Sequence, residues 1–153
     1  TAVANADGDL LATEDGVYRA LEGSLRHSGL ASATDVAAAG VPLATTEDGL
    51  FQLGNGWMDV AEGDFRFVAS DPGAAAGTLG RAHAGTPAVL YAHHDGDWTT
   101  TELDRPIVDV AYGDTVYAVS ADGRFAAEAP DGWRHQELGV RGVTAATAHT
   151  STE

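Results

Sequence analysis

The feature that most restricts the fold of this chain is a short element that occurs four times along it. TEDGVY at 13–18 recurs almost unchanged as TEDGLF at 46–51, and SADGRF at 120–125 is a looser copy. TPAVLY at 86–91 is a degenerate fourth copy, and successive copies start 33, 40 and 34 residues apart. A period of this size is typical of proteins that repeat one supersecondary unit.

Each unit is predicted to contain four short strands. The first begins with Asp-Val-Ala, at Asp35 and Asp109, and an apolar second strand follows it. An Asp-Gly turn then leads into the third strand, and this dipeptide is the strongest short signal for a β-hairpin. The fourth strand carries a tryptophan in three units and Leu25 in the first. Because Trp57, Trp98 and Trp133 recur at equivalent positions, we expect them to pack between units.

These units predict an all-β fold, in which 1–153 forms a single four-bladed β-propeller domain with four-stranded antiparallel blades. A helical solenoid is not expected, because glycine and Asp-Gly pairs interrupt every window long enough for a helix. Three of the blades are expected at 35–60, 66–103 and 107–138.

The two ends of the chain predict how the ring closes. The first unit starts at its second strand near Asp9, whereas the chain ends with a surplus copy of the first strand at Gly142–Ala146. We therefore expect the C-terminal strand to complete the first blade, which would combine 9–30 with 140–148. Such a closure would leave no open sheet edge.

Composition restricts the class of function. The 153 residues include 23 acidic and 8 basic side chains, and the net charge is −15. Nucleic-acid binding requires clustered Lys and Arg, so no nucleic-acid partner is expected. The absence of cysteine excludes disulfides, cysteine-ligated zinc and cysteine nucleophiles. No apolar run reaches 18 residues and no cationic leader is recognisable, so we expect a cytoplasmic protein with no membrane partner.

The acidity also predicts the solvent of the protein. A charge of −15 destabilises so small a domain through self-repulsion. Molar salt shortens the Debye length to about 3 Å and screens that repulsion. Aspartate outnumbers glutamate and lysine is absent, a combination that resembles cytosolic proteins of haloarchaea. The charge is then a solvent adaptation and not a sign of a basic partner; a merely acidic mesophilic protein is the alternative.

The candidate ligand-binding residues are three arginines and two aspartates. Asp35 and Asp109 open two predicted inner strands, and Arg66, Arg105 and Arg141 lie just before or within the corresponding segments. If these segments surround the mouth of a central channel, the arginines can hold a small anionic ligand through bidentate hydrogen bonds. Pairing of each arginine with a local Asp or Glu is the alternative.

Other chemistry-bearing residues point to no catalytic or metal site. His83, His93 and His94 fall on neighbouring strands of one hairpin, but adjacent strand residues point to opposite faces, so no zinc site is expected. The acidic residues in the repeated turns are interpreted as turn formers. No serine stands in a Gly-x-Ser-x-Gly context. We expect no catalytic residue, no metal and no cofactor.

The Thr/Ser-x-Asp-Gly-aromatic element, followed by Gly-Trp or Asp-Trp, resembles the Asp-box-type repeats of sialidase-like and sensor-type propellers. Together with the acidity, the whole chain resembles a small haloarchaeal β-propeller family whose members have no established activity. The motifs are structural. Sialidases use an arginine triad, a tyrosine nucleophile and an acid–base carboxylate, usually on six blades, and no residues here match that set. The resemblance therefore implies a fold and not an activity.

We expect a non-enzymatic scaffold that binds a protein or a small ligand at one face or at the channel mouth. One alternative is a hydrolase or lyase that acts on a small anionic substrate, with the three arginines as clamps. Another is a structural module whose function is to oligomerise, with monomer and homodimer both open. An enzyme requires a deep polar mouth with convergent groups of perturbed pKa, whereas an oligomer buries about 1,000 Å² or more.

Overall fold

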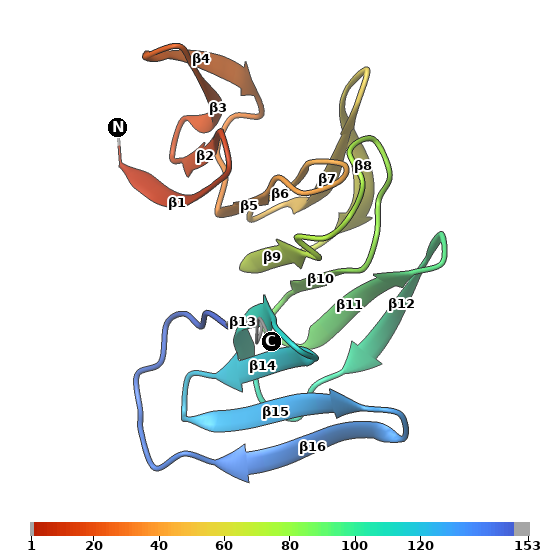
Figure 1. The fold of residues 1–153 in the computed structure, drawn as a ribbon. Coiled ribbons are helices and arrows are strands. Elements are labelled where there is room, and N and C mark those ends of the chain that lie inside the picture. The colour runs from red at the N-terminus through yellow and green to blue at the C-terminus, as the bar shows by residue number, and fades with distance from the viewer. Residues whose placement is uncertain (1, 149–153) are drawn as a thin grey trace.

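The structure, a computed structural model, describes residues 2–148, and every regular element in this range is a β-strand. The strands form four separate four-stranded antiparallel sheets, in each of which neighbouring strands follow chain order (Figure 1). No helix in the described range is long and apolar enough to cross a membrane.

Each sheet is one blade of the propeller. Blade 1 contains β1 (Val3–Asp7), β2 (Leu10–Thr13), β3 (Gly16–Leu21) and β4 (Ser24–Gly29). Blade 2 contains β5 (Asp35–Ala37), β6 (Leu43–Thr45), β7 (Gly49–Gly54) and β8 (Gly56–Glu62). Blade 3 contains β9 (Phe67–Ser70), β10 (Ala82–Gly85), β11 (Val89–His94) and β12 (Asp97–Glu102). Blade 4 contains β13 (Ile107–Tyr112), β14 (Val116–Ser120), β15 (Arg124–Ala129) and β16 (Gly132–Glu137).

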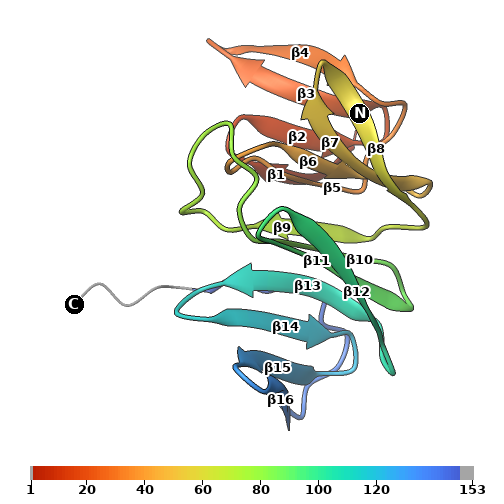
Figure 2. The ribbon, with the colours of Figure 1, turned by 90° about the vertical axis from the view of Figure 1, so that its right-hand side faces the viewer.

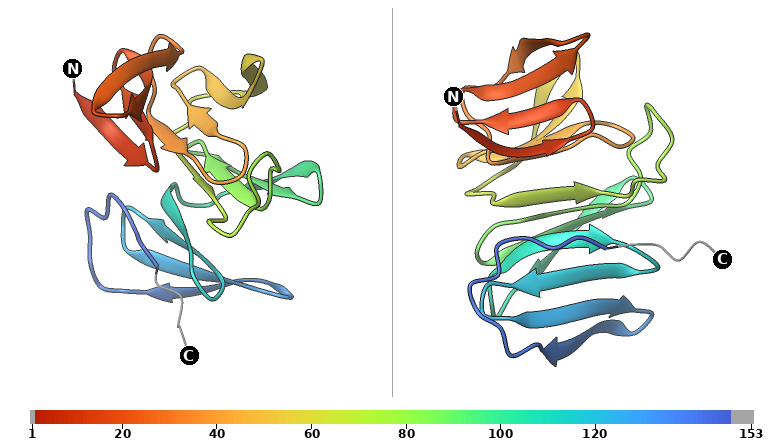
Figure 3. Two further views of the ribbon diagram at one scale, coloured as in Figure 1. Left: turned by 45° about the horizontal axis from the view of Figure 1, so that its top comes forward. Right: turned by 60° about the vertical axis from the view of Figure 1, so that its left-hand side comes forward.

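The blades follow one another along the chain, from blade 1 at the top of Figure 2 to blade 4 at the bottom. Their first strands are the inner ones: β5 packs against both β1 and β9, and β13 packs against β9. Blades 1 and 4 lie at the two ends of the resulting arc, as the views in Figure 3 show. The four-stranded blades expected from the repeats are therefore present.

The repeated sequence element forms the turn between the second and third strands of every blade. The Thr13 hydroxyl accepts a hydrogen bond from the Asp15 amide (3.1 Å), and the Thr46 hydroxyl accepts one from the Asp48 amide (3.0 Å). In blades 3 and 4 the hydroxyls of Thr86 and Ser120 accept from main-chain amides in the same way. A side-chain hydroxyl that binds its own turn explains why Thr or Ser starts each copy.

Three apolar clusters hold consecutive blades together. Each cluster combines side chains of two neighbouring blades with the fourth-strand tryptophan of the later one. Trp57 of blade 2 packs against Leu10 and Val17 of blade 1, and its indole nitrogen donates to the Ser28 carbonyl (2.9 Å). The expectation that the tryptophans pack between blades is confirmed.

The expected closure by the C-terminal strand is wrong. The inner strand of blade 1 is β1, which pairs antiparallel with β2, so this blade is complete without residues 140–148. The segment 138–148 contains no strand. Blade 1 lacks the Asp-Val-Ala sequence because Asn5 stands where blades 2 and 4 carry aspartate, and strand pairing does not depend on that side chain.

Candidate functional site

A cavity of about 860 Å³ lies at the centre of the arc. The inner strands of all four blades line it, together with residues 144–148. Most of the wall consists of main chain and small side chains, because alanines are frequent on these strands. The charged residues in the wall are Asp7, Asp35, Arg66 and Asp109.

The structure brings together three of the five predicted ligand-binding residues. Asp35, Arg66 and Asp109 line the central cavity, whereas Arg105 and Arg141 border a second depression beside blade 4. Arg66 is paired with its neighbour Asp64, at 2.6 Å between Nη2 and Oδ2, and both side chains are exposed. A clamp of three convergent arginines is therefore not formed.

Asp35 joins three blades through its carboxylate, which is 6% exposed. Its Oδ1 accepts hydrogen bonds from the Val36 amide (2.9 Å) and from the Asn5 side chain of blade 1. Its Oδ2 accepts one from the Val68 amide of blade 3 (2.9 Å). Burial raises the pKa of Asp35 to about 6, against the opposing effect of these hydrogen bonds, and the Asp109 carboxylate adds to the rise.

Asp109 repeats the same arrangement in blade 4, two blades further along the arc. Its Oδ1 accepts from the Val110 amide and its Oδ2 from the Ala146 amide, both at 2.9 Å. Burial raises the pKa of Asp109. Residues 144–148 thus lie beside β13 as β9 lies beside β5. Both aspartates connect main-chain segments, and each of their oxygens already accepts a hydrogen bond from an N–H donor.

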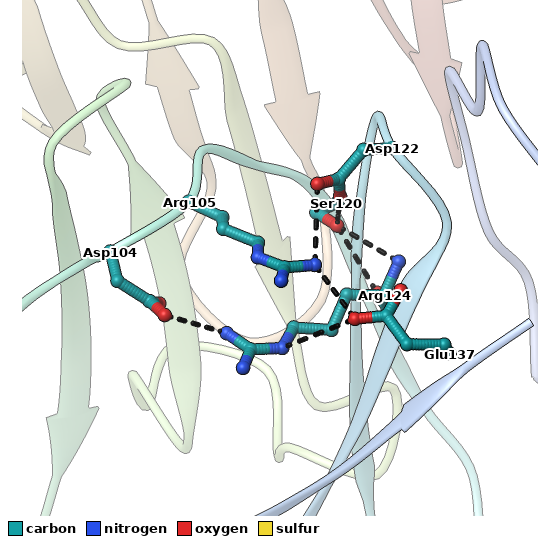
Figure 4. A network of polar contacts seen from close by, with 6 residues as sticks. All are labelled: Asp104, Arg105, Ser120, Asp122, Arg124 and Glu137. Atoms are coloured by element: carbon teal, nitrogen blue, oxygen red, sulfur yellow. Dashed lines mark hydrogen bonds and ion pairs between the residues drawn. The ribbon is translucent and has the colours of Figure 1, made fainter.

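The second depression holds a network of ion pairs (Figure 4). Arg105 pairs with Glu137 (2.8 Å) and Asp122 (3.3 Å). Arg124 pairs with Asp104 (2.8 Å) and with Glu137 (4.0 Å). The Ser120 hydroxyl, aided by Arg105, holds the pKa of Asp122 below its usual value. These guanidinium groups therefore already have carboxylate partners.

A buried polar pair that the sequence did not predict, His83 with Tyr112, lies between blades 3 and 4. His83, which is 1% exposed, makes a 2.5 Å hydrogen bond between its Nδ1 and the hydroxyl of Tyr112 on β13. Its ring lies edge-on to Trp133. Burial lowers the pKa of His83 to about 4, so the ring is neutral at pH 7. Arg81 and Glu128 form an ion pair of 2.5 Å across the same interface.

The remaining hairpin histidines are separated by the strand geometry. His93 is buried and its Nδ1 donates to the Gly80 carbonyl (2.7 Å), whereas His94 is exposed and pairs with Asp95. Within residues 2–148, no three His, Asp or Glu side chains lie close enough together to hold a metal ion. Nothing in the sequence around His83 marks Tyr112 as its partner, because the two are 29 residues apart.

Comparison with known proteins identifies the family. The model of the family described as HVO_0234-like, beta propeller, matches residues 1–149. The chain belongs to this family. The match covers nearly the whole chain, so it confirms the propeller fold expected from the repeats and found in the four blades. The description of the family names a fold and no activity. No curated protein matches the chain by sequence.

Proposed function

We propose that this member of the HVO_0234-like family is a non-enzymatic binding scaffold whose central cavity holds a small polar ligand. The observation that carries the proposal is the cavity itself, which all four blades surround. Its volume of about 860 Å³ falls within the roughly 300–1,000 Å³ typical of small-molecule sites.

One side chain in the wall has a polar atom without a hydrogen-bond partner among residues 2–148. The hydroxyl oxygen of Ser70 is buried at the end of β9, and it has no hydrogen-bond partner among residues 2–148. Buried polar atoms in folded proteins are almost always hydrogen-bonded, so we expect this hydroxyl to turn toward the cavity and to bond to the ligand when the ligand is present. Ser70 also lies on one of the inner strands that shape the cavity.

The charges in the wall favour a neutral or cationic polar ligand over the small anion considered from the sequence. Three carboxylates and one guanidinium line the cavity, and that guanidinium is already paired with Asp64. Arg105 and Arg141 border the other depression and do not add positive charge here. A protein partner at the cavity mouth remains part of the same proposal.

The competing function is that of a hydrolase or lyase acting in this cavity. The raised pKa of Asp35 favours it. A carboxyl group whose pKa is raised to about 6 can act as a general acid or base. However, both of its oxygens accept hydrogen bonds from N–H donors, so the carboxylate connects strands of neighbouring blades. The scaffold function therefore has the stronger support.

The test is a binding screen in molar salt with neutral, cationic and anionic polar metabolites, read out by calorimetry and by mass spectrometry of the native protein. We expect a neutral or cationic compound to bind one per chain. Ser70→Ala, which removes the unsatisfied hydroxyl, should weaken binding roughly tenfold, as expected for one lost hydrogen bond. Ser32→Ala, a matched exposed serine outside the cavity, should not.

A second variant tests the cavity independently of one hydrogen bond. Ala145→Tyr places a ring at a residue that lines the cavity and is exposed, so the fold should tolerate it. Binding should be lost in this variant and retained in Ala31→Tyr, at an exposed position outside the cavity. Equal binding by both tyrosine variants, or turnover of a bound compound, would overturn the proposal.

A further inference from the structure

Each contact between consecutive blades joins two different kinds of face. The forward face of a blade, turned toward the next blade, carries a third-strand apolar residue in the position of Val17, Leu50 and Leu90, which are 0%, 0% and 3% exposed. The backward face carries a small residue on the second strand and the fourth-strand tryptophan. Ala44 and Trp57 of blade 2, for example, pack against blade 1.

Within residues 2–148, no blade packs on the forward face of blade 4. Its second strand carries Tyr117 where blade 1 has the fully buried Leu10. Phe125 pairs with Val119 as Val17 pairs with Ala12, so Phe125 occupies the forward position of the third strand. The rings of Tyr117 and Phe125 stack on each other, and both remain partly exposed.

In the described part of the chain, no blade packs on the backward face of blade 1. Leu25 pairs with Ala20 as Trp57 pairs with Leu53, so Leu25 holds the tryptophan position, where it is 62% exposed. On the same face, Leu11 and Tyr18 are partly exposed, in the positions of Ala44 and Phe51 of blade 2.

The exposed apolar side chains are concentrated at these two ends. Among the described residues, the exposed large hydrophobic side chains outside blade 2 are all in blade 1 or just after blade 4: Val3, Leu21, Leu25, Leu138 and Val140. Blade 2 adds only Met58. Apolar residues gathered on particular surfaces, and not scattered singly, mark interaction sites.

We propose that a second copy of this chain docks on both ends, so that the forward face of blade 4 in each copy packs on the backward face of blade 1 in the other. The second copy is the occupant because residues 2–148 of each copy leave one face of each kind without a neighbouring blade. The contact between copies then repeats a contact that is already built three times within the chain. Two such head-to-tail contacts close a ring of two copies.

The C-terminal segment determines which strands meet at this contact. Residues 144–148 already occupy the place beside β13 that a following inner strand would take, because Ala146 donates to Asp109. The docking blade therefore meets blade 4 through its outer strands β2, β3 and β4, which carry Leu11, Tyr18 and Leu25. Leu138 and Val140, which follow β16, are exposed and lie beside the turn at Gly123.

The charge of the chain predicts how salt affects this association. Two copies of net charge −15 repel each other at low ionic strength. Molar salt reduces the Debye length to about 3 Å, so the repulsion is screened while apolar burial continues to act. Association should therefore become tighter as the salt concentration rises.

The experiment measures the mass of the full chain by sedimentation equilibrium in molar salt. We expect a dimer for the unaltered chain. Leu25→Asp removes the backward face and Phe125→Asp removes the forward face, and each should weaken the dimer by about 100-fold or more, because a carboxylate would be buried without a partner. Met58→Asp, at an exposed apolar residue away from both ends, should leave the dimer unchanged.

Mixing the two variants distinguishes this arrangement from other dimers. An equimolar mixture of Leu25→Asp and Phe125→Asp chains should regain a one-to-one dimer, because the intact forward face of one meets the intact backward face of the other. Circular dichroism checks that each variant is folded, and Tyr117→Asp replaces Phe125→Asp if the latter is not. A monomeric unaltered chain, a dimer that survives both substitutions, or a mixture that stays monomeric overturns the proposal.

Discussion

The interface between blades 2 and 3 and the interface between blades 3 and 4 use the same strands but are filled differently. Between blades 2 and 3, Leu43 and Leu50 pack against Phe65 in a fully buried apolar cluster. Between blades 3 and 4, His83 stands at the position of Leu43 and bonds to Tyr112. The repeat therefore requires a buried side chain at this position. The side chain can be apolar or polar, but a polar one must have a hydrogen-bond partner.

The stability of the two interfaces therefore depends on pH in different ways. Burial of a neutral histidine makes the blade 3–4 interface sensitive to protonation, whereas the buried residues of the apolar cluster between blades 2 and 3 carry no titratable side chain. Asp35, which links β5 to β9 beside that cluster, has a raised pKa and responds in the other direction.

The largest effect is expected from the apolar interface. Phe65→Ala removes a fully buried ring from the cluster between blades 2 and 3. It should lower the free energy of unfolding by about 3–5 kcal/mol, the usual cost of such a cavity. Denaturant titration in molar salt measures the change, with Met58→Ala at an exposed position away from both ends as the control. A loss below about 1 kcal/mol would show that this interface does not depend on apolar filling.

The polar interface should lose stability in acid. Below pH 6.5 the unfolded chain protonates His83, but the folded chain does so only near pH 4, so the free energy of unfolding falls as the pH decreases through this window. Between pH 7 and pH 5 this loss amounts to about 2 kcal/mol. His83→Leu, which copies the apolar interface, should remove that loss when unfolding is measured at both pH values.

Asp35 should oppose this loss with a slightly smaller effect. Its pKa is higher in the folded chain, so the folded chain binds more protons between pH 6 and pH 4 and gains stability as the pH decreases. The gain between pH 7 and pH 5 is about 1 kcal/mol. The unaltered chain should thus change little, while Asp35→Asn should become more acid-sensitive. An unchanged pH profile for Asp35→Asn contradicts the raised pKa.

The smallest effect is expected outside both interfaces, in the ion-pair network around Arg105 in Figure 4. Arg105 pairs with two exposed carboxylates, and exposed pairs contribute roughly 0–1 kcal/mol and less in salt. Arg105→Gln should therefore change the melting temperature by no more than a few degrees, and by less in molar salt. A large loss would assign this network a role comparable with that of the interfaces.

The sequence predicted the local parts of this protein well. The positions of the turns between second and third strands, the four strands of blades 2, 3 and 4 and the positions of the tryptophans depend on contacts within a few residues or on simple alternation. The inner strand of blade 1 was missed because its recognition depended on an Asp-Val-Ala motif, and Asn5 stands in the place of the aspartate. Strand pairing needs main-chain groups and no particular side chain.

The candidate site was only partly predictable. Asp35, Asp109 and Arg66 were expected near the channel and line it, but the hydrogen bonds of both aspartates to later segments depend on how the blades are placed. Arg105 and Arg141 were grouped with them by position in the repeat. The structure separates them because their segments lie beside the outer strands of blade 4.

By itself, therefore, the sequence determined the repeating unit, its turns and the all-β propeller fold, since these follow from local hydrogen bonding and periodicity. Only the tertiary structure decided which residues face which neighbour. In blade 4 the turn between the second and third strands is one residue longer than in blade 1. Phe125, which aligns with Tyr18 in the sequence, therefore occupies the structural position of Val17. A shift of one residue in a strand moves a side chain to the other face, and that shift placed an aromatic pair on the open end of the arc.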